Sequence, residues 1–145
     1  MHLPTAQEIN PVPENLDGQI AVRNFLGTSL EEAEALFRES SITYQEDLMF
    51  MGAPAFRFYV QAAISYIQSA AATGDSDIIS CFGSILEHRL EFEAEELVAV
   101  AAQLASVCRY ILEHYDRFAL TPDIYGDLRP RFQELEQTFL RQVHT

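Results

Sequence analysis

The chain has 145 residues, of which 48% are hydrophobic and 11% aromatic, a composition that excludes intrinsic disorder and predicts one globular domain with a buried core. Acidic residues outnumber basic ones by 22 to 9, and the formal net charge of −13 repels nucleic-acid phosphates and anionic lipids, so no direct binding to nucleic acid or to a membrane is expected. All the basic residues are arginine, and the lack of lysine excludes Schiff-base chemistry and a lysine-containing phosphate loop.

The N-terminal stretch MHLPTAQEINPVPEN, residues 1–15, has neither a basic start nor a long apolar run, so it is unlike a secretory signal. Its prolines indicate a flexible N-terminal arm ahead of the folded part. Elsewhere the apolar runs are too short to cross a bilayer. These features favour a cytoplasmic location.

Helical periodicity begins after this arm. The first periodic stretch, residues 16–26, indicates a short helix. Ser29 is followed three positions later by Glu32, the sequence pattern of a capping box, which predicts the start of the next helix. Because Thr43 and Glu46 repeat that pattern, a further short helix is expected to begin there.

A longer helix is predicted from Pro54, since proline suits the first turn of a helix. Its apolar residues recur every three or four positions and include Phe56 and Tyr59. The Asp-Ser-Asp of residues 75–77 supplies a cap for another helix. Gly83 lies inside that helix, where glycine usually indicates close approach of a neighbouring segment.

Arg89 projects toward the apolar stripe of the same helix, so we expect the helix to end there. The acidic stretch EFEAEE, residues 91–96, is expected to open a long helix, because carboxylates complement the dipole at a helix N-terminus. Pro130 marks the start of a final helix. We therefore predict an all-α fold, a single-domain helical bundle of about six or seven helices over residues 16–145, preceded by the flexible arm of residues 1–15.

Parts of two stretches, FMGAPAFRFYVQAAISYIQSAAATGDSDII and FEAEELVAVAAQLASVCRYILEHYDRF, form a pattern of an Ala-Phe-x-aromatic-Tyr helix, an Asp-containing helix start and an acidic-start helix that ends near a His-Tyr pair. The positions are Ala55, Phe56, Phe58, Tyr59, Asp77, His114 and Tyr115. This pattern resembles a small bacterial all-helical domain family of uncharacterised function. The resemblance spans roughly residues 50–118 and departs from the family at Gln61, where the family has proline, and in a longer C-terminal tail. It implies a helical fold and no assigned activity.

The tetrapeptide Ile-Leu-Glu-His occurs twice and ends at His88 and at His114. Adjacent residues on a helix diverge by about 100°, so neither Glu87 with His88 nor Glu113 with His114 can chelate one ion as a pair. We predict that both histidines border the core and that the protein binds no metal.

No motif for catalysis is present. Cys81 and Cys108 lie in apolar stretches without CxxC spacing and are predicted to be buried free thiols. The serines occur in no Gly-x-Ser-x-Gly context, and glycine-rich phosphate loops are lacking. We predict no catalytic residue and no cofactor, although a constellation assembled only by the fold stays an alternative.

Five carboxylates are concentrated within ten residues and are offset only by Arg89: Glu87, Glu91, Glu93, Glu95 and Glu96. Such a cluster is typical of a solvated helix face, but it also suits docking of a basic protein. The sequence therefore favours a non-enzymatic protein-interaction module, for example an inhibitor or immunity-type protein for a basic partner. Two alternatives stay open: a helical enzyme or ligand-binding domain with a pocket among tyrosines, and a self-associating subunit. The tyrosines of that pocket would be Tyr44, Tyr59, Tyr66 and Tyr110.

Overall fold

The computed structural model describes residues 2–144 and confirms the all-α class, with no strand in that range. Its longer helices, each of ten residues or more, are α2 (Leu16–Phe25), α3 (Leu30–Phe50), α4 (Ala53–Ile67), α5 (Ser76–Glu93), α6 (Ala101–Glu113) and α8 (Arg129–Val143). They group into two compact units, Met1–Tyr66 and Ile67–Thr145. Within the described range no helix is both long enough and apolar enough to span a membrane.

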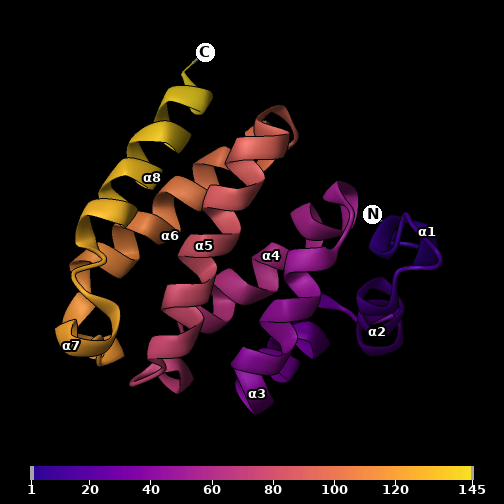
Figure 1. The fold of residues 1–145 in the computed structure, drawn as a ribbon, viewed down its shortest axis with the longest axis horizontal. Helices are drawn as coiled ribbons and strands as arrows, with labels where there is room; N and C mark the ends of the chain where they lie inside the picture. Colours follow the sequence, from indigo (N-terminus) through magenta and orange to yellow (C-terminus); the bar gives the residue numbers. More distant parts are fainter. Residues whose placement is uncertain (1, 145) are drawn as a thin grey trace. The chain divides into compact units, whose positions relative to one another are not determined.

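The first unit contains the helices at the indigo to magenta end of the chain (Figure 1). Aromatic side chains form much of its core. The ring of Tyr59 is fully buried, 5.0 Å from the ring of Phe25, and the Phe37 ring lies 6.0 Å from Phe25. The Tyr59 hydroxyl lies within hydrogen-bonding distance of the main-chain oxygens of Phe25 and Thr28, so this core tyrosine is satisfied by the main chain. The helices are α1 (Ala6–Ile9), α2 (Leu16–Phe25), α3 (Leu30–Phe50) and α4 (Ala53–Ile67).

Helix α1 lies inside the segment for which we predicted a flexible arm. Thr5 and Glu8 form a complete capping box at its start, and Ile9 is fully buried. The main-chain N–H of Gly52 donates to the Ile9 carbonyl, at a position where a side chain on residue 52 would overlap the chain around Glu8. The arm is therefore fixed in part by a glycine that is distant in the sequence.

The predicted capping box of Ser29 and Glu32 is confirmed at the start of α3. The second predicted start, at Thr43, is displaced. The backbone leaves helical geometry at Ser40, and the Ser40 hydroxyl donates to the Thr43 hydroxyl oxygen over 2.8 Å. This bond lies at the kink, which comes three residues earlier than the pattern indicated.

The second unit places α8 beside both α5 and α6 (Figure 1). The predicted close approach at Gly83 is confirmed, because a Cβ atom there would lie 2.8 Å from Cδ of Arg131 and 3.2 Å from Cζ of Phe132, both on α8. On the other side, the Arg109 guanidinium of α6 donates to both carboxylate oxygens of Glu136 over 2.9 and 2.6 Å. The α-helices of this unit are α5 (Ser76–Glu93), α6 (Ala101–Glu113), α7 (Pro122–Tyr125) and α8 (Arg129–Val143).

Two predicted boundaries in this unit are wrong. Helix α5 does not end at Arg89 but continues to Glu93, because the i,i+4 spacing lets the buried Arg89 guanidinium pair with the Glu93 carboxylate over 3.3 Å. The acidic stretch does not open a long α-helix either. It leads into a 3₁₀ segment, η2 (Ala94–Val100), and α6 begins only at Ala101.

The Phe56 side chain of α4 is fully buried, whereas Phe92 of α5 keeps 67% of its surface exposed. We expect Phe56→Ala to lower the free energy of unfolding by about 3–5 kcal/mol, through lost apolar contacts and an unfilled cavity. Phe92→Ala removes the same atoms from a solvated position and is expected to change stability by about 0.5 kcal/mol or less. Urea denaturation of both variants provides the measurement, and equal effects would contradict the assigned core.

Candidate functional site

A groove of about 380 Å³ runs between α5 and α8 in the second unit. We call it the α5–α8 groove. Its apolar walls are formed by the half-buried Leu90 and the buried Leu135. Its polar lining residues are Glu87, Glu91, Arg131, Glu134 and Thr138. Gly83 lets Arg131, one of these lining residues, pack closely against α5.

Carboxylates are in excess around this groove. The Arg131 guanidinium pairs with Glu87 over 3.2 Å and points a further nitrogen at the Ser80 carbonyl, 3.4 Å away. The carboxylates of Glu91 and Glu134 are exposed and have neither an ion pair nor a hydrogen bond within residues 2–144. The two carboxylates without a counter-charge therefore lie in a groove with apolar walls. This arrangement suits a cation with an aliphatic stem, such as an arginine side chain.

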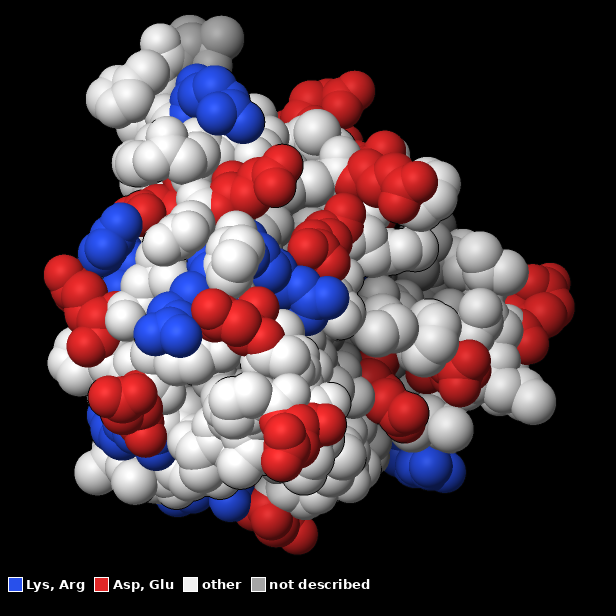
Figure 2. Space-filling view, turned by 60° about the vertical axis from the view of Figure 1, so that its left-hand side comes forward, with Lys and Arg blue, Asp and Glu red and all other residues white. Residues whose placement is uncertain are grey.

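The five clustered carboxylates of the sequence do not form one equivalent surface. Glu87 and Glu91 reach the groove, while Glu93 is partly neutralised by Arg89. Burial lowers the pKa of the Arg89 guanidinium, and the charge of Glu93 acts in the opposite direction. Glu95 and Glu96 are exposed on η2. Figure 2 shows acidic and basic side chains interleaved on the face that includes the α8 side, rather than one continuous acidic surface.

Sequence reasoning missed the contribution of α8. Arg131 and Glu134 are three residues apart on that helix, a spacing that places both on one face. Gly83 signalled that some segment would approach, but not which one. Only the packing of α8 on α5 shows that Glu134 lines the same groove as Glu91.

The two Ile-Leu-Glu-His stretches lie on different helices, the first on α5 and the second at the end of α6. Both histidines are exposed; the His88 ring lies 4.9 Å from that of Phe92, and the His114 ring stacks on Tyr110 at 4.1 Å. Nδ1 of His114 is 3.0 Å from the Tyr110 carbonyl oxygen. Among residues 2–144 no three His, Cys, Asp or Glu side chains are grouped so that they could hold a metal ion.

The tyrosines of the alternative prediction occupy different environments. Tyr59 and Tyr66 are buried, and Tyr59 belongs to the aromatic core of the first unit. Tyr44 packs edge-on against Phe25 at 6.1 Å. Tyr110 lies in the second unit. Its ring stacks on the His114 ring, and the Arg117 guanidinium lies 5.2 Å from the centre of the Tyr110 ring.

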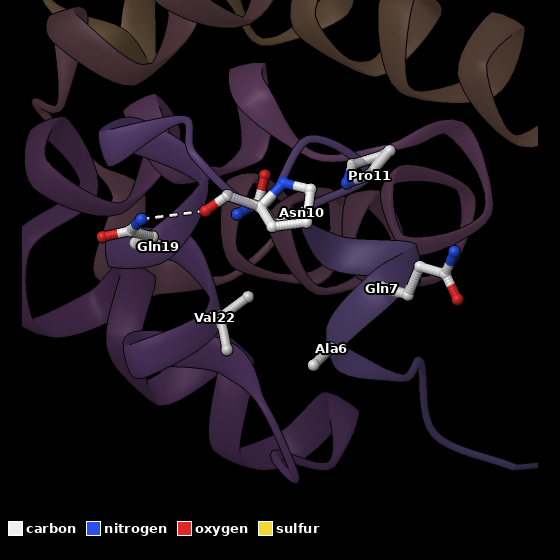
Figure 3. A pocket seen from close by; sticks show the side chains of 7 residues that line it. Ala6, Gln7, Asn10, Pro11, Gln19 and Val22 are labelled. Atoms are coloured by element: carbon white, nitrogen blue, oxygen red, sulfur yellow. Dashed lines mark hydrogen bonds between the residues drawn. The ribbon is translucent and has the colours of Figure 1, made fainter.

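A second groove, of about 570 Å³, lies in the first unit between α1 and α2 (Figure 3). We call it the α1–α2 groove. Ala6 and Val22 face each other across it, and the Gln19 side chain donates to the Pro13 carbonyl over 2.8 Å. The lining residues are Ala6, Gln7, Asn10, Pro11, Pro13, Gln19 and Val22, none of which is charged.

Comparison with known proteins gave no match: no family model, curated protein or solved structure matches the chain. The resemblance to a bacterial helical family therefore stays a prediction. Function has to be argued from the grooves and their chemistry.

Cys81 and Cys108 are not joined by a disulfide, and their surroundings differ. Cys81 is half-buried, whereas Cys108 is fully buried on α6. Burial raises the pKa of the Cys108 thiol to about 12, and the charge of Glu136 acts in the same direction. The prediction of buried thiols is thus confirmed for Cys108 and only partly for Cys81.

Because the thiolate is the reactive species, the raised pKa of Cys108 leaves almost no nucleophile at pH 8. We expect iodoacetamide to alkylate Cys81 in the folded protein at least about 100-fold faster than Cys108, and both at similar rates in denaturant. Mass spectrometry of Cys81→Ala and Cys108→Ala gives the two rates separately. Equal rates in the folded state would contradict the buried position of Cys108.

Proposed function

We propose that the protein is a non-enzymatic interaction module that binds a basic segment of a partner protein in the α5–α8 groove. An inhibitor or immunity-type protein for a basic partner is the most concrete form of this role. The observation that carries the proposal is that Glu91 and Glu134 line a groove with apolar walls and form no ion pair within the described range.

An arginine or lysine side chain suits this groove in two ways. Its methylene stem packs against Leu90 and Leu135, and its charged end reaches the two carboxylates. Arginine is the better fit, since its planar guanidinium can donate to both carboxylates at once. Arg131 stays paired with Glu87 and closes one side of the site.

The net charge of −13 supports the same proposal through the rate of association. Long-range attraction accelerates the encounter with a basic partner at low salt. The Debye length falls from about 30 Å at 0.01 M salt to about 8 Å at physiological salt, so association slows as salt is added. This effect of the total charge has to be separated from binding in the groove.

The test uses a fluorescent peptide that contains two arginines, together with a matched peptide in which citrulline replaces them. We expect the arginine peptide to bind and the citrulline peptide to bind much more weakly, as measured by fluorescence anisotropy. Glu91→Gln with Glu134→Gln should weaken the arginine peptide about five- to thirty-fold, because two partly exposed ion pairs of roughly 0.5–1 kcal/mol each are lost.

Two control pairs separate the groove from the general acidity. Glu39→Gln with Glu46→Gln removes the same charge from exposed positions of α3, and Glu95→Gln with Glu96→Gln removes it from η2. Each is expected to change affinity by less than about twofold at physiological salt. Losses as large as those of the groove pair would contradict the proposal and assign the attraction to total charge or to the η2 carboxylates.

The alternatives of a tyrosine-lined enzyme and of a self-associating subunit stay predictions. The buried Tyr59, bonded to the main chain, favours a role in the core over a role in a pocket.

A further inference from the structure

The α1–α2 groove contains a polar group that the protein leaves without a partner. Asn10 retains only 8% of its surface exposed, and within residues 2–144 its carboxamide makes no hydrogen bond. Its amide nitrogen and oxygen are not themselves enclosed, so water or a ligand can reach them from the groove. The Asn10 side chain therefore offers the two N–H donors of its amide nitrogen and an acceptor oxygen to whatever enters the groove.

The position of this carboxamide is set by Gly18 of α2. A Cβ atom on residue 18 would overlap Oδ1 and Cγ of Asn10, so the amide can lie against the helix backbone only because residue 18 is glycine. The nearby donor on α2 is already in use, since the Gly18 N–H donates to the Asn15 side chain over 3.0 Å as part of the helix cap. The Asn10 amide is thus held against α2 without bonding to it.

The walls of the groove are aliphatic. Ala6 and Val22 line opposite sides, and Pro11 and Pro13 supply ring carbons and no main-chain N–H (Figure 3). Gln19 is occupied by its bond to Pro13, and the Gln7 amide extends away from the groove in Figure 3. Of these three amides, Asn10 is the buried one, whereas Gln7 and Gln19 are exposed.

The chemistry of the occupant follows from this lining. A chain with 31 charged residues places none of them here, so a charged ligand would lose its hydration without a counter-charge. The volume of about 570 Å³ is within the range typical of small-molecule sites. We infer that the α1–α2 groove binds a neutral small molecule with an aliphatic body and an amide-like polar group that pairs with the Asn10 carboxamide.

The test is a ¹H–¹⁵N NMR titration of the full chain with hexanamide, and separately with hexanoate and hexylammonium. These probes share the aliphatic chain and differ in charge. We expect hexanamide to shift the backbone signals of residues 6–22 with a dissociation constant on the order of 1 mM, as suits so small a ligand. Hexanoate and hexylammonium should bind at least about tenfold more weakly.

Variants assign the binding to the groove. Asn10→Leu keeps the shape but removes the hydrogen-bonding group, and it should weaken hexanamide about tenfold. Val22→Phe should abolish binding by filling the groove. Gln103→Leu makes a similar amide-to-leucine change at an exposed position of α6 and should leave the affinity unchanged. If Asn10→Leu fails to fold, as judged by circular dichroism, the discrimination among the three probes and the Val22→Phe variant still decide.

Three results would overturn the inference. The first is the absence of any shift among residues 6–22 with hexanamide. The second is equal affinity for the neutral and the charged probes, which would contradict selection of a neutral ligand by the uncharged lining. The third is movement of the same signals on dilution of the protein alone, which would assign the groove to contact with a second copy of the chain.

Discussion

The direct packing of α8 on the backbone of α5 at Gly83 is the contact on which the α5–α8 groove depends. Gly83 permits it, since any side chain there would meet Arg131 and Phe132 of α8. The same approach carries Arg131 to within 3.2 Å of the Glu87 carboxylate and brings Glu134 to the groove that Glu91 also lines. A Cβ atom on residue 83 would therefore force a shift of the Arg131 side chain, which lines the groove and pairs with Glu87.

Ion pairs decide which carboxylates of the second unit are available to a partner. Glu136 is engaged by Arg109, Glu93 by Arg89, and Glu87 by Arg131. Each pairing orders the fold and reduces local charge at once. Glu91 and Glu134 have no such partner in the described range and also line the groove, so they are better candidates for recognition than carboxylates picked by the density of acidic residues alone.

Local signals in the sequence were sufficient for much of the helical framework and insufficient for the sites. Ser29 and Asp75 cap helices as predicted, because capping depends only on residues within one turn. The kink at Ser40 and the continuation of α5 past Arg89 involve side-chain bonds, which helical periodicity does not encode. Glu134 and Asn10 acquire their roles only through residues distant in sequence or held by tertiary packing, so no pattern of spacing could have identified them.

The most direct measurement of the central contact is the nuclear Overhauser effect between the Hα protons of Gly83 and the ring protons of Phe132 in the intact protein. The account predicts a strong cross-peak, since a Cβ atom on residue 83 would lie 3.2 Å from Cζ of that ring. It also predicts cross-peaks between Gly83 and the Cδ protons of Arg131. Absence of these cross-peaks in a spectrum that shows the sequential contacts of α5 would mean that α8 does not pack on α5, and the groove built between them would be contradicted.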